Sequence, residues 1–242
     1  MVRTTPRACH PGTVTAQPPA DGLRSGERSW ATLHGGLAPS APVRVWLRGV
    51  QRLASAGPVA RVPPDALSVA GVAVGAVALA VASAGSRWPL LAAVLVVLAG
   101  VLDGLDGAVA VHTGRARPLG AVVDAMADRV GDLLLVGTLT VLGAPLPWCV
   151  AAGALTVLHE YLRARAGAAG MPGIGAVTVA ERPTRLVLVA VACLGAGALP
   201  GGTPLTGWGW ATVSAVAWVV IGAVGLAHLA VGVARTTPRT FR

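Results

Sequence analysis

Half of the acidic side chains of this 242-residue chain gather in a single segment, DGLDGAVAVHTGRARPLGAVVDAMAD, and in the helical turn after it. They are Asp103, Asp106, Asp124, Asp128 and Asp132, out of ten Asp and Glu in all. Carboxylates held this close repel one another where the dielectric is low, so protons or cations must neutralise them. Oxygen ligands of this kind suit Mg²⁺, Mn²⁺ or Ca²⁺, and the coordination of Mg²⁺ is typically completed by substrate phosphates.

The spacing of these aspartates places them on two helix faces. Asp103 and Asp106 are three residues apart, and Asp124, Asp128 and Asp132 follow one another at intervals of four, so each set shares a face of its helix. The short connection between the two helices makes them neighbours, and the two faces can then converge. The pattern predicts a two-metal site for a substrate that contains a diphosphate.

Small and basic residues surround the cluster. Gly107, Gly114 and Gly120 would let a substrate approach the backbone, and Arg115 and Arg117 are close enough in sequence to bind phosphate.

The segments that must position this cluster are strongly apolar. Hydrophobic residues make up 54% of the chain, charged residues 12%, and the mean hydropathy is +0.69. A soluble domain carries about 25% charged residues. Six apolar segments each approach the roughly 20 residues that cross a bilayer. They lie at about 65–84, 88–111, 119–142, 145–163, 184–199 and 207–234.

The expected fold is an all-α integral membrane protein with six transmembrane helices. Residues 43–57 alternate apolar and Arg side chains, which predicts an amphipathic helix lying at the membrane interface before the first span. The domain organisation expected is a disordered segment at 1–42, a six-helix domain at 43–235 and a tail at 236–242.

The arginines predict the orientation. The loops that would share one side of the membrane carry Arg44, Arg48, Arg52, Arg61, Arg115, Arg117, Arg163, Arg165, Arg182, Arg185, Arg235, Arg239 and Arg242. Basic loops face the cytoplasm, so both termini and the aspartate cluster should lie on the cytoplasmic side of the cell inner membrane. Trp88, Trp148, Trp208 and Trp210 mark the opposite ends of the spans, as an aromatic belt would. This distribution accounts for the net charge of +9 without nucleic acid as a partner.

The aspartate motif resembles the signature of the CDP-alcohol phosphatidyltransferases, D-x2-D-G-x2-A-R-x8-G-x3-D-x3-D. Asp103, Asp106, Gly107 and Ala110, followed by Gly120, Asp124 and Asp128, match every spacing of that signature. The resemblance extends to the six spans, the preceding amphipathic helix and Pro64-Asp65, where the family often has Pro-Asn, and covers about residues 43–235. One position departs, because Val111 stands where the family has an Arg, and the resemblance implies that this Arg would contact the nucleotide of the donor. Arg115 and Arg117 are the candidates to supply the missing charge.

The resemblance implies a mechanism and roles for these residues. A CDP-linked lipid, usually CDP-diacylglycerol, would bind beside Gly107, Ala110, Arg115, Arg117 and Gly120, with its diphosphate on two Mg²⁺ ions or, alternatively, Mn²⁺. Asp103, Asp106 and Asp124 would be metal ligands. Asp128 would take the proton of the acceptor hydroxyl and could also touch a metal. The acceptor would replace CMP on the lipid phosphate.

A second set of arginines suggests the class of acceptor. Arg163 and Arg165 end one apolar segment, and Arg182 and Arg185 open the next, which would bring four unpaired guanidinium groups together. Arg binds phosphate oxygens two at a time, so we expect a phosphorylated alcohol such as inositol phosphate or glycerol 3-phosphate. Arg129 would either join this site or compensate the charge of the aspartates.

Two other classes of membrane protein remain open. A prenyltransferase also binds Mg²⁺-diphosphate, but usually through two well-separated Asp-rich motifs on more spans. A cation transporter would place its carboxylates near the bilayer midplane, often on broken helices. For the oligomeric state, both a monomer and a homodimer are compatible with the sequence.

Overall fold

The computed structural model describes residues 41–171 and 180–236, and within these ranges every regular element is a helix. The helices are α2 (Ala41–Ala54), α3 (Gly57–Ala60), α4 (Pro64–Ser83), α5 (Trp88–His112), α6 (Pro118–Val141), α7 (Leu146–Ala168), α8 (Arg182–Ala198) and α9 (Trp210–Thr236). The prediction of an all-α chain is confirmed for this part of the sequence. Of the segment expected to be disordered, residues 1–40 lie outside the described residues, as do residues 237–242 of the expected tail.

Each of the six predicted apolar segments coincides with one long helix, α4 to α9, and the sequence explains where these helices begin. Five of them have a proline in the first or second position: Pro64, Pro89, Pro118, Pro147 and Pro183. Proline fits there because the first amides of a helix have no acceptor within it, so the missing N–H costs nothing.

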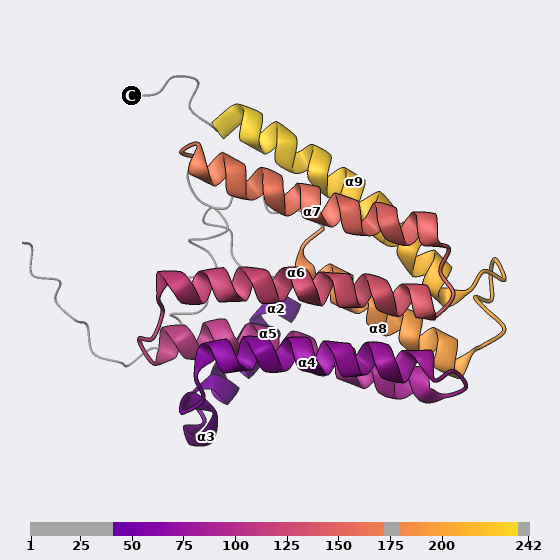
Figure 1. Ribbon diagram of the computed structural model, residues 1–242, viewed down its shortest axis with the longest axis horizontal. Helices are drawn as coiled ribbons and strands as arrows, with labels where there is room; N and C mark the ends of the chain where they lie inside the picture. The colour runs from indigo at the N-terminus through magenta and orange to yellow at the C-terminus, as the bar shows by residue number, and fades with distance from the viewer. Residues whose placement is uncertain (1–40, 172–179, 237–242) are drawn as a thin grey trace, which may run out of the picture.

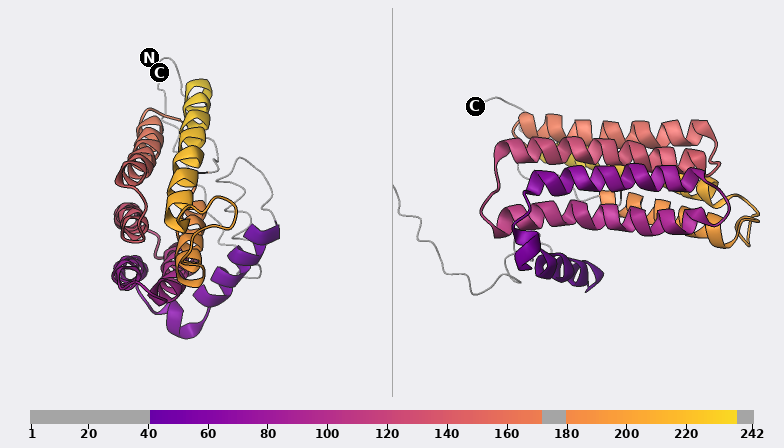
Figure 2. Two further views of the ribbon diagram at one scale, coloured as in Figure 1. Left: turned by 90° about the vertical axis from the view of Figure 1, so that its right-hand side faces the viewer. Right: turned by 60° about the horizontal axis from the view of Figure 1, so that its bottom comes forward.

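The six long helices form two layers of three (Figure 1). Viewed nearly along the helices, α4, α6 and α7 form one layer, and α5, α8 and α9 form the other (Figure 2). The extensive contacts of α4 with α5 and of α7 with α9 join the two layers. Helix α2 runs at an angle to the bundle and packs on α5.

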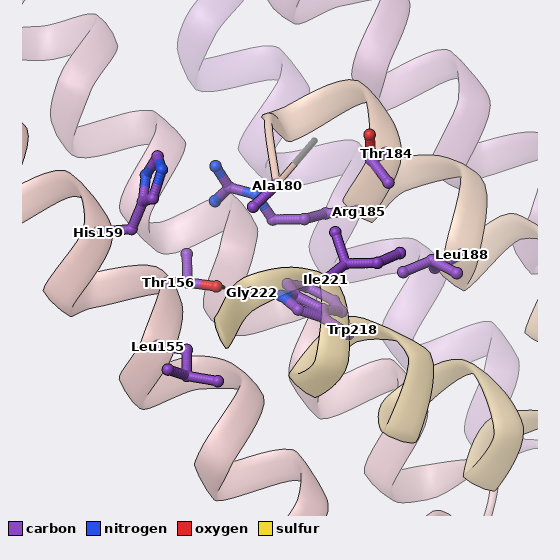
Figure 3. Close-up of a pocket in the computed structure, with 10 residues that line it drawn as sticks. All are labelled: Leu155, Thr156, His159, Ala180, Thr184, Arg185, Leu188, Trp218, Ile221 and Gly222. Carbon is purple, nitrogen blue, oxygen red and sulfur yellow. Dashed lines mark hydrogen bonds between the residues drawn. The ribbon is translucent and has the colours of Figure 1, made fainter. Parts of the chain in front are cut away.

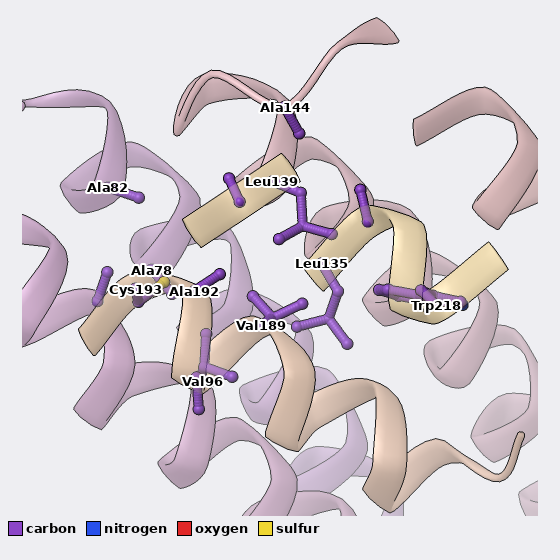
Figure 4. Close-up of a cluster of buried hydrophobic side chains, with 14 of the residues drawn as sticks. Ala78, Ala82, Val96, Leu135, Leu139, Ala144, Val189, Ala192, Cys193 and Trp218 are labelled. Carbon is purple, nitrogen blue, oxygen red and sulfur yellow. The ribbon is translucent and has the colours of Figure 1, made fainter. Parts of the chain in front are cut away.

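Small side chains fill most of the core of the bundle. Ala78, Ala192, Val96, Leu139 and Val189 are almost fully buried in one cluster (Figure 4). Helices in a bilayer associate mainly by close packing, and small residues at their contacts permit it. An alanine Cβ at Gly195, for example, would lie 2.1 Å from Cδ2 of Trp210.

Three helices, α4, α5 and α9, are long and apolar enough to cross a membrane. Helix α8 has 17 residues and is too short to meet this criterion of length and apolar composition, and α6 does not meet it because it carries four charged side chains. In α2, Val50 and Ala54 pack against the bundle, whereas Arg48 and Arg52 are exposed.

Candidate active site

A tight turn between α5 and α6 brings the two halves of the aspartate motif together. Gly114 has a φ of +66°, which suits glycine after the end of a helix, and the amide of Arg115 donates to the carbonyl of Ala110 at 2.9 Å. Both helices therefore place the motif at the same end of the bundle. Asp103, Asp124 and Asp128 each offer a carboxylate oxygen, and these oxygens lie within 4.8 Å of one another.

Asp106 lies apart from this group of three. Its side chain is 4% exposed, and it accepts hydrogen bonds from the hydroxyl of Ser68 on α4 and from the amide of Gly107, the latter at 2.5 Å. Ser68 did not stand out in the sequence, because a lone serine within an apolar run has no distinguishing pattern. Its contact with Asp106 ties α4 to the motif helix.

The two motif glycines Gly107 and Gly120 have different surroundings, open at the first and close-packed at the second. An added Cβ at Gly107 would meet no atom within 4 Å, so the space above this residue is free. At Gly120, an added Cβ would lie 3.3 Å from Cγ of Arg117 and 3.5 Å from Oδ1 of Asp65, and these two side chains form an ion pair. Arg117 therefore borders the motif on the side of Pro64-Asp65.

The remaining predicted donor residues lie near the turn between α5 and α6. Ala110 is partly buried, Arg115 is exposed in the turn, and Val111 is 64% exposed at the end of α5. The structure thus places the departing position Val111 at the surface, just before the turn that contains both candidate arginines.

The expectation of four unpaired guanidinium groups was wrong, because three of the four arginines form ion pairs. Arg163 lies 2.8 Å from Glu181, and Arg185 lies 2.5 Å from Asp132. Arg182 contacts two aspartates of the motif, as described below. Arg165 is exposed near the end of α7. Apart from Glu160, which lies three residues before Arg163, the pairing partners are distant in sequence, so spacing alone could not reveal them.

Glu160 is a central residue of this network that the sequence did not indicate. Its carboxylate lies 3.2 Å from Arg185, 3.6 Å from Arg129 and 3.8 Å from Arg163, which belong to three different helices. The one available signal was that Glu160 is the only acidic residue of α7 and lies three residues before Arg163. The carboxylate therefore holds three guanidinium groups together beside Asp132.

A small cavity adjoins this network between α7, α8 and α9 (Figure 3). Its polar lining includes Thr156, His159 and Arg185, and the indole of Trp218 donates to the hydroxyl of Thr156 at 3.1 Å. The cavity thus lies within the bundle and adjoins the arginine network at Arg185.

The three clustered carboxylates fit a divalent cation. Hard oxygen donors from Asp103, Asp124 and Asp128 are the ligand type that Mg²⁺ and Mn²⁺ prefer. The open space over Gly107 leaves room for a substrate beside them.

A family model of the CDP-alcohol phosphatidyltransferases matches residues 61–224, more than half of the chain. The chain belongs to this family. The resemblance of the aspartate motif is therefore confirmed, and among the three classes of membrane protein considered the match favours the first. Together with the three apolar helices, family membership identifies an integral membrane protein.

Several curated proteins are similar to the chain. The phosphatidylinositol phosphate synthase of Mycolicibacterium smegmatis is 36% identical over 136 residues, which are 53% of this chain and 60% of that protein. The archaetidylinositol phosphate synthase of Aeropyrum pernix is 32% identical over 46% of this chain and 60% of its own length. The matches thus span about 60% of these relatives.

Solved structures share the fold. The phosphatidylinositol phosphate synthase of Mycobacterium tuberculosis with CDP-DAG bound has a TM-score of 0.63 at 24% identity, covering 81% of this chain and 98% of that one. The same enzyme in complex with manganese and citrate also has a TM-score of 0.63, at 23% identity, covering 80% and 92%.

Proposed function

We propose that the protein transfers a phosphatidyl group from CDP-diacylglycerol to a phosphorylated alcohol and releases CMP. The observation that carries this proposal is the group of carboxylate oxygens of Asp103, Asp124 and Asp128 beside the open face of Gly107, in a chain that belongs to this family. The M. tuberculosis relative binds CDP-DAG, which supports the choice of donor.

Asp103, Asp124 and Asp128 would hold the metal, with Asp106 completing the set that the signature implies. Two Mg²⁺ ions, or Mn²⁺, would neutralise the diphosphate of the donor when bound. The manganese complex of the M. tuberculosis relative supports a divalent ion of this kind. Gly107, Ala110 and Gly120 would line the donor, and Arg115 and Arg117 would contact its phosphates.

The transfer of the phosphatidyl group begins with removal of a proton from the acceptor. Asp128 takes the proton of the acceptor hydroxyl, whose oxygen attacks the phosphorus on the lipid side of the diphosphate. The bond from that phosphorus to the bridging oxygen breaks, and CMP leaves with the electron pair. Most of the rate enhancement comes from holding the two substrates in line and balancing charge, because the chemistry needs no further reactive group.

The acceptor phosphate would bind at the arginine network. Arg129, Arg163 and Arg185 lie around Glu160, and Arg165 is exposed nearby, whereas the guanidinium of Arg182 is directed at the aspartates. Several similar proteins are named phosphatidylinositol phosphate synthase or archaetidylinositol phosphate synthase, which favours inositol phosphate over glycerol 3-phosphate.

For the membrane arrangement, we propose six spans, α4 to α9, with α2 lying at the interface. The end of the bundle that carries the aspartates would face the cytoplasm, and the protein would lie in the cell inner membrane. A homodimer remains an alternative assembly.

Metal-dependent release of CMP tests this function. Purified protein with CDP-diacylglycerol and inositol phosphate should release CMP, lose this activity on thorough chelation and regain it with Mg²⁺ or Mn²⁺. Turnover that survives chelation would contradict the metal site.

A further inference from the structure

Arg182, the first residue of α8, links the two helices of the aspartate motif. Its Nη2 lies 3.0 Å from Oδ1 of Asp103 on α5, and its Nη1 lies 2.6 Å from Oδ1 of Asp128 on α6. Nη1 also donates a hydrogen bond to the backbone carbonyl of Asp128 at 2.8 Å. The side chain is 16% exposed, so this guanidinium lies largely within the protein.

A glycine on α6 makes room for this arrangement. A Cβ added at Gly131 would lie 2.7 Å from Nη2 of Arg182 and 3.4 Å from Cζ. Contacts below 3.0 Å are not tolerated, so any side chain at this position would push the guanidinium away from the helix. The lack of a side chain at Gly131 therefore allows the guanidinium of Arg182 to lie against α6.

The other charged groups nearby have further partners outside the carboxylate group of Asp103, Asp124 and Asp128. Arg129 lies 3.5 Å from Asp128 but also contacts Asp132 and Glu160, and Asp132 lies 2.5 Å from Arg185. Of these arginines, Arg182 is the one that contacts both Asp103 and Asp128, which belong to the carboxylate group suited to a metal ion.

We propose that Arg182 is an internal counter-cation that competes with divalent ions for Asp103 and Asp128. The absence of a side chain at Gly131 leaves the space that its guanidinium occupies beside these aspartates. This inference rests on the proposed metal-dependent function. A guanidinium and a metal ion would both bind the carboxylates of Asp103 and Asp128, and two cations a few ångströms apart repel each other in a partly buried site. Arg182 therefore stabilises the protein when the ions are absent and lowers their affinity.

Two effects of opposite sign follow for Arg182→Gln. The variant should unfold at a lower temperature without added metal, because the carboxylates lose their counter-charge. It should also bind Mn²⁺ roughly tenfold more tightly, which corresponds to about 1.4 kcal/mol. Because a ligand that binds the folded state stabilises it more as its affinity rises, a given Mn²⁺ concentration should raise the unfolding temperature of the variant more than that of wild type.

The experiment measures free Mn²⁺ by electron paramagnetic resonance during titration of the purified full chain in detergent, without substrate. Gly131→Ala keeps the charge of Arg182 but displaces it, so it should tighten Mn²⁺ binding by a smaller factor, about threefold. Gly137→Ala, on the same helix, is the control, because its Cβ would make only an ordinary 3.4 Å contact with Leu79. Its Mn²⁺ affinity should equal that of wild type.

The outcomes separate this inference from the proposed function. Wild-type Mn²⁺ affinity in both Arg182→Gln and Gly131→Ala, or weaker binding in both, would overturn the role of Arg182 and leave the metal site intact. Absence of Mn²⁺ binding in wild type and in the variants would overturn the metal site itself and the inference with it. If Arg182→Gln does not fold, the comparison of Gly131→Ala with Gly137→Ala decides.

Discussion

Asp128 combines two features that the proposed reaction requires of a base. Its carboxylate belongs to the oxygen group with Asp103 and Asp124, and it is partly exposed at the end of the bundle that carries the motif. Asp128→Asn keeps the size of the side chain but cannot take a proton, so we expect kcat for CMP release to fall roughly 100-fold or more. The KM for CDP-diacylglycerol should change much less. Steady-state kinetics of the purified variant check this, and a kcat within a few-fold of wild type would remove Asp128 from the mechanism.

Arg117 provides a second test at the residue scale. It pairs with Asp65 beside Gly120 and lies six residues after Val111, the position where the family signature has Arg. If Arg117 supplies the missing charge, Arg117→Ala should raise the donor KM about threefold to tenfold, equivalent to about 0.6–1.4 kcal/mol. Adding Val111→Arg should recover much of this loss. A double variant no better than Arg117→Ala alone would reject the compensation.

At the scale of elements, the contact of α8 with α9 depends on a close approach at Gly195. An alanine there would place Cβ 2.1 Å from Cδ2 of Trp210, whose indole donates to the carbonyl of Leu199. Gly195→Ala should therefore destabilise the protein by about 1–3 kcal/mol, as overpacking generally does. Thermal unfolding in detergent measures the effect. Gly167→Ala is the matched control, since its Cβ would meet no atom within 4 Å, and equal stability of both variants would refute this packing.

Element positions were largely predictable from sequence, because long apolar runs bounded by proline, glycine and arginine leave little choice. The predicted segment 65–84 corresponds to Pro64–Ser83, and 119–142 corresponds to Pro118–Val141. The segment 145–163 was too short, because α7 continues through its charged end to Ala168. The apolar pattern of α7 ends where its charged residues begin, but the backbone hydrogen bonds of the helix continue through these residues.

The arrangement of charged side chains was less predictable. The helical spacing of the aspartates predicted that Asp103 and Asp106 converge with Asp124 and Asp128, since local geometry fixes which residues share a face. Asp103, Asp124 and Asp128 do form one group, and Asp106 is not part of it. Ser68 carried no such signal, because its partner Asp106 lies on another helix, and the spacing of Glu160 indicated only its contact with Arg163, not those with Arg129 and Arg185. For the same reason, the arginines at the start of α8 seemed unpaired until the packing of α6, α7 and α8 was known.

For the whole molecule, the proposed orientation predicts which loops are accessible from outside the cell. Leu205, in the loop before α9, is 97% exposed, and Ala116 is exposed in the turn between α5 and α6 at the other end of the bundle. In a background without Cys9, Cys149 and Cys193, an impermeant maleimide should label Leu205→Cys in intact spheroplasts. Ala116→Cys should react only after permeabilisation. The reverse pattern would contradict a cytoplasmic active site.

The proposed reaction moves a phosphatidyl group to a phosphorylated alcohol. Its most direct test is to incubate the purified protein with CDP-diacylglycerol, Mg²⁺ and, in separate reactions, inositol phosphate, glycerol 3-phosphate, inositol and serine, and to identify the lipid product by mass spectrometry. We expect equimolar CMP and a phosphatidylated product that retains the acceptor phosphate, with inositol phosphate the best acceptor and inositol and serine poor ones. Efficient conversion of inositol or serine, with both phosphorylated alcohols inert, would contradict it.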